Sequence, residues 1–425
     1  MAAVTVLRLR VPGDKSLSHR ALMFAALADG RSRLRGVLPS ADVRSTAGVL
    51  AALGVDVATE WDDADEVIVV GRGVRGLQEP STALDCGNSG TTTRLMAGIV
   101  AGHLMTATFT GDESLSRRPM RRVARPLAQM GARFVFARDD GLPMTICGGA
   151  LRALSYASPT ASAQVKSALL LAGLVGGVPV RVDEPQRSRD HTERLLAAQG
   201  ATLVVDDDGV ALEPGGRLAP LALRIPGDPS SAIFPLALAL LLGRAVLVER
   251  VLVNPTRTGA LRVLARMGAP VARLDETISG GEPVAELAVE RVPGLRGTNI
   301  GGDEIPSLID ELPMLACLAA RAEGETVISD ATELRVKESD RIAAVVSNLR
   351  AIGADADERP DGLVVRGSPR PLAGRVTTHG DHRIAMAFGV LAALPGNDIA
   401  IDDRECVRVS YPGFWAQLAH VATSA

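Results

Sequence analysis

The sequence predicts an α/β protein of two lobes, each built from three similar units of helix and paired strands. Five times along the 425-residue chain, an apolar helical stretch ends at a glycine and strand-like residues follow. These marker glycines suit the left-handed position after a helix and recur at intervals of 68 to 85 residues, at Gly54, Gly131, Gly200, Gly268 and Gly353. A looser sixth copy is expected from about residue 375 to the C-terminus.

Tight turns and a longer repeat divide these copies into two halves. VPGDKSLSHRALMFAAL at 11–27 resembles IPGDPSSAIFPLALAL at 225–240. We therefore expect one lobe over 15–226, a second over 1–14 with 227–425, a hinge at the two Pro-Gly-Asp turns, and a ligand between the lobes. Paired strands are expected at three hairpin dipeptides, Asp140-Gly141, Asp208-Gly209 and Asp361-Gly362.

Composition excludes several classes of function. The net charge is −3 and only 3% of residues are aromatic, so we expect no binding of nucleic acid. The longest apolar run, Ala232–Leu242, is shorter than the ~20 residues of a membrane span, and no secretory signal is visible at the N-terminus. The four cysteines form no CxxC pair, so we expect no zinc site or disulfide framework and a reducing cytosol.

Lysine is rare in this chain, which draws attention to each lysine that it has. Of 46 basic residues only Lys15, Lys166 and Lys337 are lysines. A guanidinium stays protonated, whereas a buried ammonium can lose its proton and act as an acid or base. Chance is the alternative explanation, and the motifs around Lys15 and Lys337 make it weaker there.

The motif PGDKSLSHR predicts an anion site at the start of a helix. The N–H groups and dipole of a helix N-terminus favour anions, and Lys15, Ser16 and Arg20 add donors on the same side. A plain helix capped by serine is the alternative, but it does not require both a lysine and an arginine. We expect His19 on the helix surface.

A second anion cradle is predicted at GNSGTTTR, where Asn88, Gly90, Thr91 and Arg94 lie on a glycine-rich loop that enters a helix. The loop has no lysine after its glycines and does not match GxGxxG, so ATP binding has no support. The following run, LSRRPMRRVARP, is a solvated basic surface or supplies one or two arginines that clamp a phosphate or carboxylate.

Polar groups open further helices. In SAQVKSA, Ser162 and Gln164 suit hydrogen bonds to a sugar-like ring, with helix capping as the alternative. In IDELPM, Asp310 and Glu311 begin a helix, which is a common place for acids.

Two charged motifs follow near the C-terminus. RVKESDR holds Lys337, Glu338 and Arg341, for which a salt-bridged surface helix is the alternative. HGDHRIAMA contains two histidines and Arg383, but nothing supplies a third ligand, so we expect no metal. Together the motifs indicate a site that binds two small polyanions and moves protons through lysine and carboxylate groups.

These seven motifs, in this order, resemble those of the 5-enolpyruvylshikimate-3-phosphate (EPSP) synthase family along the whole chain. The resemblance implies the enolpyruvyl transferase fold, in which each lobe has three βαβαββ units with helices packed inside. It also implies transfer of the enolpyruvyl group of phosphoenolpyruvate to the 5-hydroxyl of shikimate 3-phosphate through a tetrahedral adduct. The family uses no metal or organic cofactor, so we expect none, in a cytoplasmic monomer of the shikimate pathway that glyphosate inhibits beside Gly90.

The resemblance also implies roles for single residues. Asp310 is the base toward the hydroxyl, Glu338 with Lys337 handles the methylene proton, and Lys15 bridges both substrates. Shikimate 3-phosphate is expected to contact Lys15, Ser16, Arg20, Ser162, Gln164, Arg189, Asp310 and Lys337. Phosphoenolpyruvate is expected to contact Lys15, Gly90, Arg118, Arg341 and Arg383, with Asn88, Thr91 and Arg94 supporting the loop.

The chain departs from the family pattern at several positions. Arg189 stands near the place of a tyrosine that is common beside the shikimate ring, as in a divergent branch. Ala163 replaces a frequent serine and Glu333 a frequent asparagine. Val409 occupies the position of a frequent lysine, with Arg408 as the candidate substitute, which puts one phosphoenolpyruvate contact in doubt.

Two other functions compete with this interpretation. The sister transferase that acts on UDP-N-acetylglucosamine usually carries a cysteine on the loop that here reads GDESLSRRPM. A non-catalytic phosphometabolite-binding protein would retain the arginines but lose Asp310, Glu338 or Lys337. The missing cysteine and the three retained residues favour the shikimate enzyme.

Overall fold

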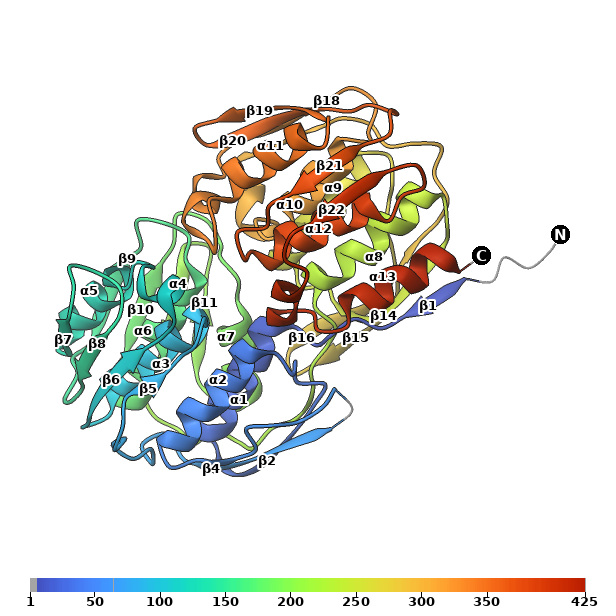
Figure 1. Cartoon of the computed structure of the whole chain (residues 1–425). Helices are drawn as coiled ribbons and strands as arrows, with labels where there is room; N and C mark the ends of the chain where they lie inside the picture. The colour runs from blue at the N-terminus through green and yellow to red at the C-terminus, as the bar shows by residue number, and fades with distance from the viewer. Residues whose placement is uncertain (1–5, 64, 425) are drawn as a thin grey trace. The chain divides into compact units, whose positions relative to one another are not determined.

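The computed structural model describes residues 6–63 and 65–424, which form two compact units (Figure 1). Unit 2 contains Gly13–Ile225 and Ile278–Glu282. Unit 1 contains the N-terminal segment up to Pro12, then Pro226–Thr277, and the chain from Pro283 onward. The chain thus crosses between units within the first Pro-Gly-Asp turn and just before the second, although their role as a hinge remains a prediction.

One sheet pattern recurs in unit 2. The first two strands of each sheet are parallel, and the remaining two continue it in antiparallel fashion. The strand orders are β13(Ala222–Arg224)–β2(Asp29–Arg35)–β4(Glu66–Arg72)–β3(Asp56–Val57), β5(Leu84–Asp85)–β6(Thr106–Thr110)–β8(Met144–Cys147)–β7(Arg133–Phe136), and β9(Leu154–Ala157)–β10(Val180–Asp183)–β12(Gly209–Leu212)–β11(Leu203–Val205). The strand β13 comes from the far end of the unit and closes the first sheet.

Unit 1 repeats this strand order twice and then shortens it. The four-stranded sheets are β1(Leu7–Leu9)–β14(Val246–Leu252)–β16(Glu282–Val289)–β15(Ala272–Ser279) and β17(Asn299–Ile300)–β18(Glu325–Ile328)–β20(Gly362–Arg366)–β19(Asp355–Arg359). The third has two parallel strands, β21(Ala373–Val376) and β22(Asp398–Ile401). This small sheet is the looser sixth copy.

Three largely buried helices form the centre of unit 2: α1(Lys15–Leu27), α3(Gly90–Gly102) and α6(Ala163–Gly176). A Cβ atom on Gly98 would lie 2.1 Å from the Ala168 carbonyl oxygen, so glycine is needed where α3 approaches α6. More exposed helices complete the unit: α2(Ala41–Ala52), α4(Glu113–Ser116), α5(Arg121–Met130) and α7(His191–Ala198).

Unit 1 has an equivalent centre in α8(Pro229–Leu242), α10(Leu312–Ala319) and α12(His382–Ala392), which share one apolar core. The other α-helices of the unit are α9(Gly259–Arg266), α11(Arg341–Ala351) and α13(Phe414–Thr423). In the described part of the chain, four short 3-10 helices join these elements: η1(Pro255–Arg257), η2(Gly302–Ser307), η3(Thr332–Val336) and η4(Glu405–Val409). The apolar run noted in the sequence lies in α8, and within the described residues no helix has the length and apolarity of a bilayer span.

The predicted turns are confirmed, but two of the hairpin glycines are needed for a reason other than positive φ. All five marker glycines have positive φ, between 85° and 117°. The three hairpin dipeptides join β7 to β8, β11 to β12 and β19 to β20. Gly209 and Gly362 do not have positive φ, and glycine is needed there for close packing instead. A Cβ atom there would lie 2.1 Å and 1.9 Å from backbone oxygens of Val182 and Ile328.

Candidate functional site

The start of α1 carries the first predicted anion-binding residues. Asp14 caps this helix, because its carboxylate accepts a 2.8 Å hydrogen bond from the Leu17 N–H. The cap is therefore an aspartate and not the serine of the capping alternative. Lys15 forms an ion pair with buried Asp42 in the first turn of α2, and Ser16 remains partly exposed.

Arg20 is buried and joins three helices. Its Nε donates to Thr192 Oγ1 at 2.8 Å, its Nη2 to Ser167 Oγ at 3.0 Å, and its Nη1 to the Ser16 carbonyl oxygen at 3.1 Å. Burial is the main cause that lowers the pKa of Arg20 to about 10, and the positive charge of Arg189 contributes to the same shift against the opposing charges of Glu193 and Asp14. The like charges of these two guanidinium groups favour an anion that interacts with both.

The loop that leads into α3 lies against an arginine of the following loop. Arg118 Nη2 donates to Asn88 Oδ1 at 2.7 Å, and Asn88 Nδ2 donates to Asp112 Oδ2 at 2.6 Å. A methyl group on Gly90 would lie 3.1 Å from Arg94 Nη1 and 3.6 Å from Arg118 Nη1. Glycine at this position therefore leaves room beside two guanidinium groups.

Hydrogen bonds join this loop to the start of α6. Arg94 Nη1 donates to Gln164 Oε1 at 2.7 Å, and Gln164 Nε2 donates to Thr91 Oγ1 at 3.1 Å. Ser162 caps α6 and also accepts a 2.8 Å hydrogen bond from Arg122 Nη2. The helix cap of the alternative interpretation is thus confirmed for this serine, and its role toward a sugar-like ring stays a prediction.

His19 is not a surface residue, as the sequence had suggested, but is fully buried. Its Nδ1 lies 2.6 Å from Thr46 Oγ1, which in turn lies 2.7 Å from Thr92 Oγ1. Burial, followed by the charges of Lys15 and Arg20, holds the pKa of His19 well below its ordinary value. The neutral ring therefore acts as a hydrogen-bonding link between α1, α2 and α3.

In unit 1, three cationic groups converge on Asp310. Its Oδ1 lies 3.4 Å from Arg341 Nη1, 3.8 Å from Lys337 Nζ and 3.9 Å from Arg383 Nε. Arg383 Nη1 also donates to the Asp310 carbonyl oxygen at 3.1 Å. The side chain of Asp310 is 14% exposed, so the structure gathers the predicted base and three predicted binding residues around a partly open position.

Arg341 is buried among carboxylates. Its Nη2 lies 2.6 Å from Glu338 Oε2 and its Nε lies 2.8 Å from Asp381 Oδ2. Burial disfavours the charged forms of both Arg341 and Asp381. Their attraction outweighs burial, so the pKa of Arg341 is raised and that of Asp381 is lowered. Asp381 also caps α12 through the Arg383 N–H and accepts a hydrogen bond from Ser339 Oγ.

Several partners of these residues have no feature in the sequence that marks them as functional. Asp42 and Asp112 begin helices, and in a sequence they resemble ordinary N-terminal acids. Arg122 belongs to the arginine run but could not be told apart from its neighbours. Asp381 was visible in its motif, yet only the fold brings it to Arg341.

The departures toward the C-terminus lie on two short 3-10 helices. Arg408 is 72% exposed and pairs with Glu405 at 3.2 Å, and its role as the substitute for a lysine at Val409 stays a prediction. Glu333 is exposed on a 3-10 helix.

One cluster has atoms close enough to hold a metal, as judged over residues 6–63 and 65–424. It consists of Asp190, His191 and Glu282. His191 Nδ1 lies 2.7 Å from Glu282 Oε1, and Arg194 Nε lies 2.8 Å from Asp190 Oδ2 and 3.8 Å from Glu282 Oε2. These contacts account for the cluster, and we assign no metal to it.

Comparisons with known proteins agree with this arrangement. Residues 6–418 match the family model of EPSP synthase (3-phosphoshikimate 1-carboxyvinyltransferase). A 3-phosphoshikimate 1-carboxyvinyltransferase of Herpetosiphon aurantiacus is 49% identical over 419 residues, which cover 97% of this chain and 96% of the relative. Another, of Desulforudis audaxviator, is 50% identical over 407 residues, which cover 95% of this chain and 94% of that protein.

Similarity to a solved structure supports the same family. EPSP synthase from Acinetobacter baumannii superposes with a TM-score of 0.85 at 39% identity, covering 98% of this chain and 95% of the other. The predicted family and fold are thereby confirmed. The chain belongs to the EPSP synthase (3-phosphoshikimate 1-carboxyvinyltransferase) family.

Proposed function

We propose that this protein transfers the enolpyruvyl group of phosphoenolpyruvate to the 5-hydroxyl of shikimate 3-phosphate and releases phosphate. The observation that carries the proposal is the match to 3-phosphoshikimate 1-carboxyvinyltransferases over nearly the whole chain. A cytoplasmic, monomeric enzyme that needs no cofactor is part of the same proposal.

Binding of shikimate 3-phosphate is assigned to one set of charged and polar side chains. The neighbouring charges of Arg20 and Arg189 support a role in holding its phosphate. The hydroxyl and amide groups at the start of α6 suit the ring hydroxyls. The proposed contacts are Lys15, Ser16, Arg20, Ser162, Gln164, Arg189, Asp310 and Lys337.

Binding of phosphoenolpyruvate is assigned to a second set of cations. Arg118 is oriented by Asn88, and the glycine at position 90 leaves space beside it. Arg341 is held by Asp381, so its guanidinium is preorganised before substrate arrives. The proposed contacts are Lys15, Gly90, Arg118, Arg341 and Arg383, with Asn88, Thr91 and Arg94 supporting the loop.

The reaction needs two proton transfers in its first step. A proton adds to the methylene carbon of phosphoenolpyruvate, and the oxygen of the 5-hydroxyl bonds to the adjacent carbon as its own proton leaves. We assign the hydroxyl proton to Asp310 and the methylene proton to Glu338 with Lys337. Departure of phosphate and loss of one methyl proton then restore the vinyl group.

Lys15 is proposed to bridge the two substrates and to protonate a leaving oxygen. Its ammonium pairs with Asp42, and its side chain is 19% exposed, which leaves it accessible to ligands. An ammonium has three N–H donors, which suit the oxygens of a phosphate group.

A coupled assay of phosphate release tests the proposal. Phosphoenolpyruvate with shikimate 3-phosphate should release phosphate, whereas phosphoenolpyruvate with UDP-N-acetylglucosamine should not. Release with the nucleotide sugar instead would assign the chain to the sister reaction. Binding of shikimate 3-phosphate without release would identify a non-catalytic binding protein.

A further inference from the structure

Lys166 is the one lysine of the chain to which the proposed chemistry gives no direct part. It lies on α6 and is only 3% exposed. Its Nζ lies 2.7 Å from Glu184 Oε2 and 2.8 Å from Glu193 Oε1, and both of these carboxylate side chains are also buried. One buried ammonium therefore joins α6 to the loop after β10 and to the first turn of α7.

The charge state of this cluster excludes proton transfer by Lys166. Burial alone would lower the pKa of Lys166, but Glu193 and Glu184 outweigh it, so the pKa is raised. Burial also raises the pKa of Glu193, although Lys166 opposes this effect. Lys166 thus stays an ammonium at neutral pH. Its role is to hold two carboxylates that would otherwise be uncompensated.

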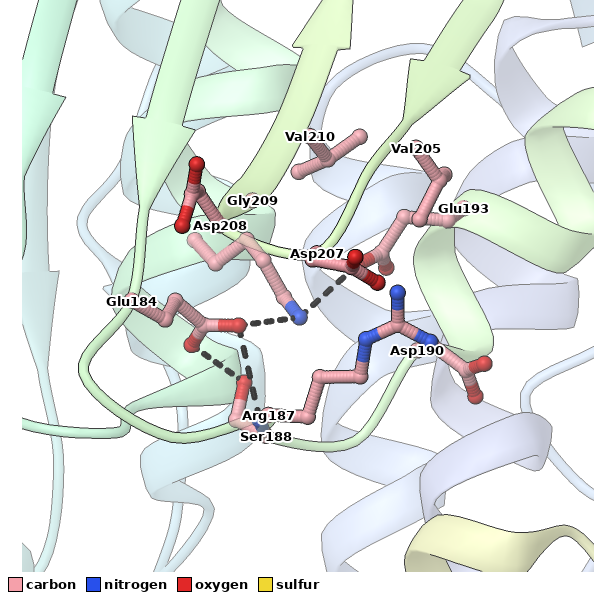
Figure 2. Close-up of a pocket in the computed structure, with 11 residues that line it drawn as sticks. Glu184, Arg187, Ser188, Asp190, Glu193, Val205, Asp207, Asp208, Gly209 and Val210 are labelled. Atoms are coloured by element: carbon pink, nitrogen blue, oxygen red, sulfur yellow. Dashed lines mark hydrogen bonds and ion pairs between the residues drawn. The ribbon is translucent and has the colours of Figure 1, made fainter.

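Glu184 also restrains the loop over residues 184–190, through hydrogen bonds with Ser188. The Ser188 hydroxyl donates to Glu184 Oε1 at 2.5 Å, and the Ser188 N–H donates to Glu184 Oε2 at 3.4 Å. Figure 2 shows these two side chains turned toward one another. The next residue is Arg189, and α7 begins two residues later at His191. Arg189 is therefore flanked by a restrained serine and a restrained helix.

Ser167 and Thr192, the sequence neighbours of Lys166 and Glu193, make a second connection between α6 and α7. Ser167 Oγ lies 2.7 Å from Thr192 Oγ1, and Arg20 donates to both. The pairs Lys166–Glu193 and Ser167–Thr192 together fix α7 against α6. Arg189 lies near enough to Arg20 to lower its pKa, so this connection also bears on the distance between the two guanidinium groups.

The space beside the cluster is too small to be another substrate site. The cavity lined by Lys166, Glu184, Ser188 and Glu193 has a volume of about 30 Å³, enough for about one or two water molecules. Figure 2 shows further acidic side chains around it, among them Asp190 and Asp207. The cluster supports a site rather than forming one.

We infer that Lys166 is a positioning residue for shikimate 3-phosphate, which acts by holding the loop over 184–190 so that Arg189 stands beside Arg20. This inference rests on the proposed function. It explains why an ammonium is suited to position 166, where a compact cation must lie between two carboxylates, while a planar guanidinium requires more space.

The test is a double-mutant cycle on substrate affinity. Lys166→Met leaves two buried carboxylates without a cation and is expected to destabilise the fold. A second variant, Lys166→Met with Glu184→Gln and Glu193→Gln, removes all three charges and keeps the side-chain shapes. Each is combined with Arg189→Met. Thermal unfolding and circular dichroism identify the folded variants.

We expect the triple variant to raise KM for shikimate 3-phosphate about tenfold, with kcat and KM for phosphoenolpyruvate nearly unchanged. Arg189→Met should raise the same KM, and the combination should add little, because both changes remove one interaction. A KM for shikimate 3-phosphate equal to that of the wild type, or effects that multiply, would overturn the inference. If wild-type protein releases no phosphate with shikimate 3-phosphate, the proposed function itself is wrong.

Discussion

Asp310 is surrounded by the cations that the proposed reaction uses. Arg341, Lys337 and Arg383 each approach its Oδ1 within the range of 3.4 to 3.9 Å. Each of these cations can exchange part of its interaction with Asp310 for an anionic substrate. Asp310 is the residue to which we assign the hydroxyl proton.

Replacing Asp310 by asparagine should abolish most turnover without unfolding the protein, because the amide retains the shape but accepts no proton. We expect kcat to fall ~100- to 10,000-fold, the range typical of a general acid or base. The measurement is phosphate release at saturating substrates, with a thermal melt of each variant. Asp398→Asn, at an exposed strand residue, is the matched control. A folded variant that loses less than about tenfold would contradict the assignment.

Arg341 and Asp381 should link stability to pH. The pKa of Asp381 is lowered in the folded state, so this pair stabilises the fold fully above the ordinary value of 3.8. The stabilisation is lost as the pH falls through the lower, folded value. Arg341→Met leaves Asp381 buried and unpaired, which should cost about 3–5 kcal/mol at pH 7.

The loss from Arg341→Met should shrink in acid, because burial without the guanidinium raises the pKa of Asp381 in the variant. Asp381 of the variant can then take up a proton at a pH where the wild-type pair is still intact, and a protonated Asp381 needs no cationic partner. Urea unfolding of both proteins at pH 7 and near pH 4 measures this difference. Arg350→Met, at an exposed ion pair on the same helix, should cost at most about 1 kcal/mol at either pH. A loss that is the same at both pH values would show that the ion pair is not its source.

The positions of single residues were predictable from the sequence where a motif opened a helix. Lys15 and Gly90 begin α1 and α3, whereas Asp310 lies two residues before α10. Their partners were not predictable, because Lys15 meets Asp42 only after α1 packs on α2. The burial of His19 was not predictable either, because its sequence neighbours do not show which face of α1 contacts α2 and α3.

At the scale of elements, glycine spacing was the most informative signal. The marker glycines end their helices with positive φ, as the sequence predicted. Other glycines have a role that no local pattern reveals. Gly98 permits α3 to approach α6, whereas Gly48, which is exposed on α2, has no atom within 4 Å of a hypothetical Cβ outside its own helix.

These two helical glycines give opposite predictions. Gly98→Ala would place a methyl group against the Ala168 carbonyl oxygen, so we expect a loss of about 1–3 kcal/mol in the free energy of unfolding. Gly48→Ala should instead gain about 0.5–1 kcal/mol, because alanine favours a helix interior. Urea unfolding of both variants checks the pair. Equal changes of the same sign would refute the packing argument.

At the scale of the whole molecule, the repeats predicted the number of units but not how each unit closes. Strand β13 pairs in parallel with β2, and β1 pairs in parallel with β14, so each unit completes its first sheet with a strand distant in sequence. Both closing strands have three residues. So short a strand has too little periodicity to be recognised before its partner is known.

In the proposed reaction, this chain adds a proton to phosphoenolpyruvate and removes one from the 5-hydroxyl of shikimate 3-phosphate. An ether bond thereby replaces the bond between the enolpyruvyl group and phosphate. Turnover of phosphoenolpyruvate and shikimate 3-phosphate in deuterium oxide, followed by NMR of the product, tests it most directly. If a solvent proton adds to the methylene carbon, the vinyl group of the product should carry deuterium, and phosphate should appear in equal amount. A product whose vinyl group holds no deuterium, or phosphate released without an enolpyruvyl ether, would contradict the account.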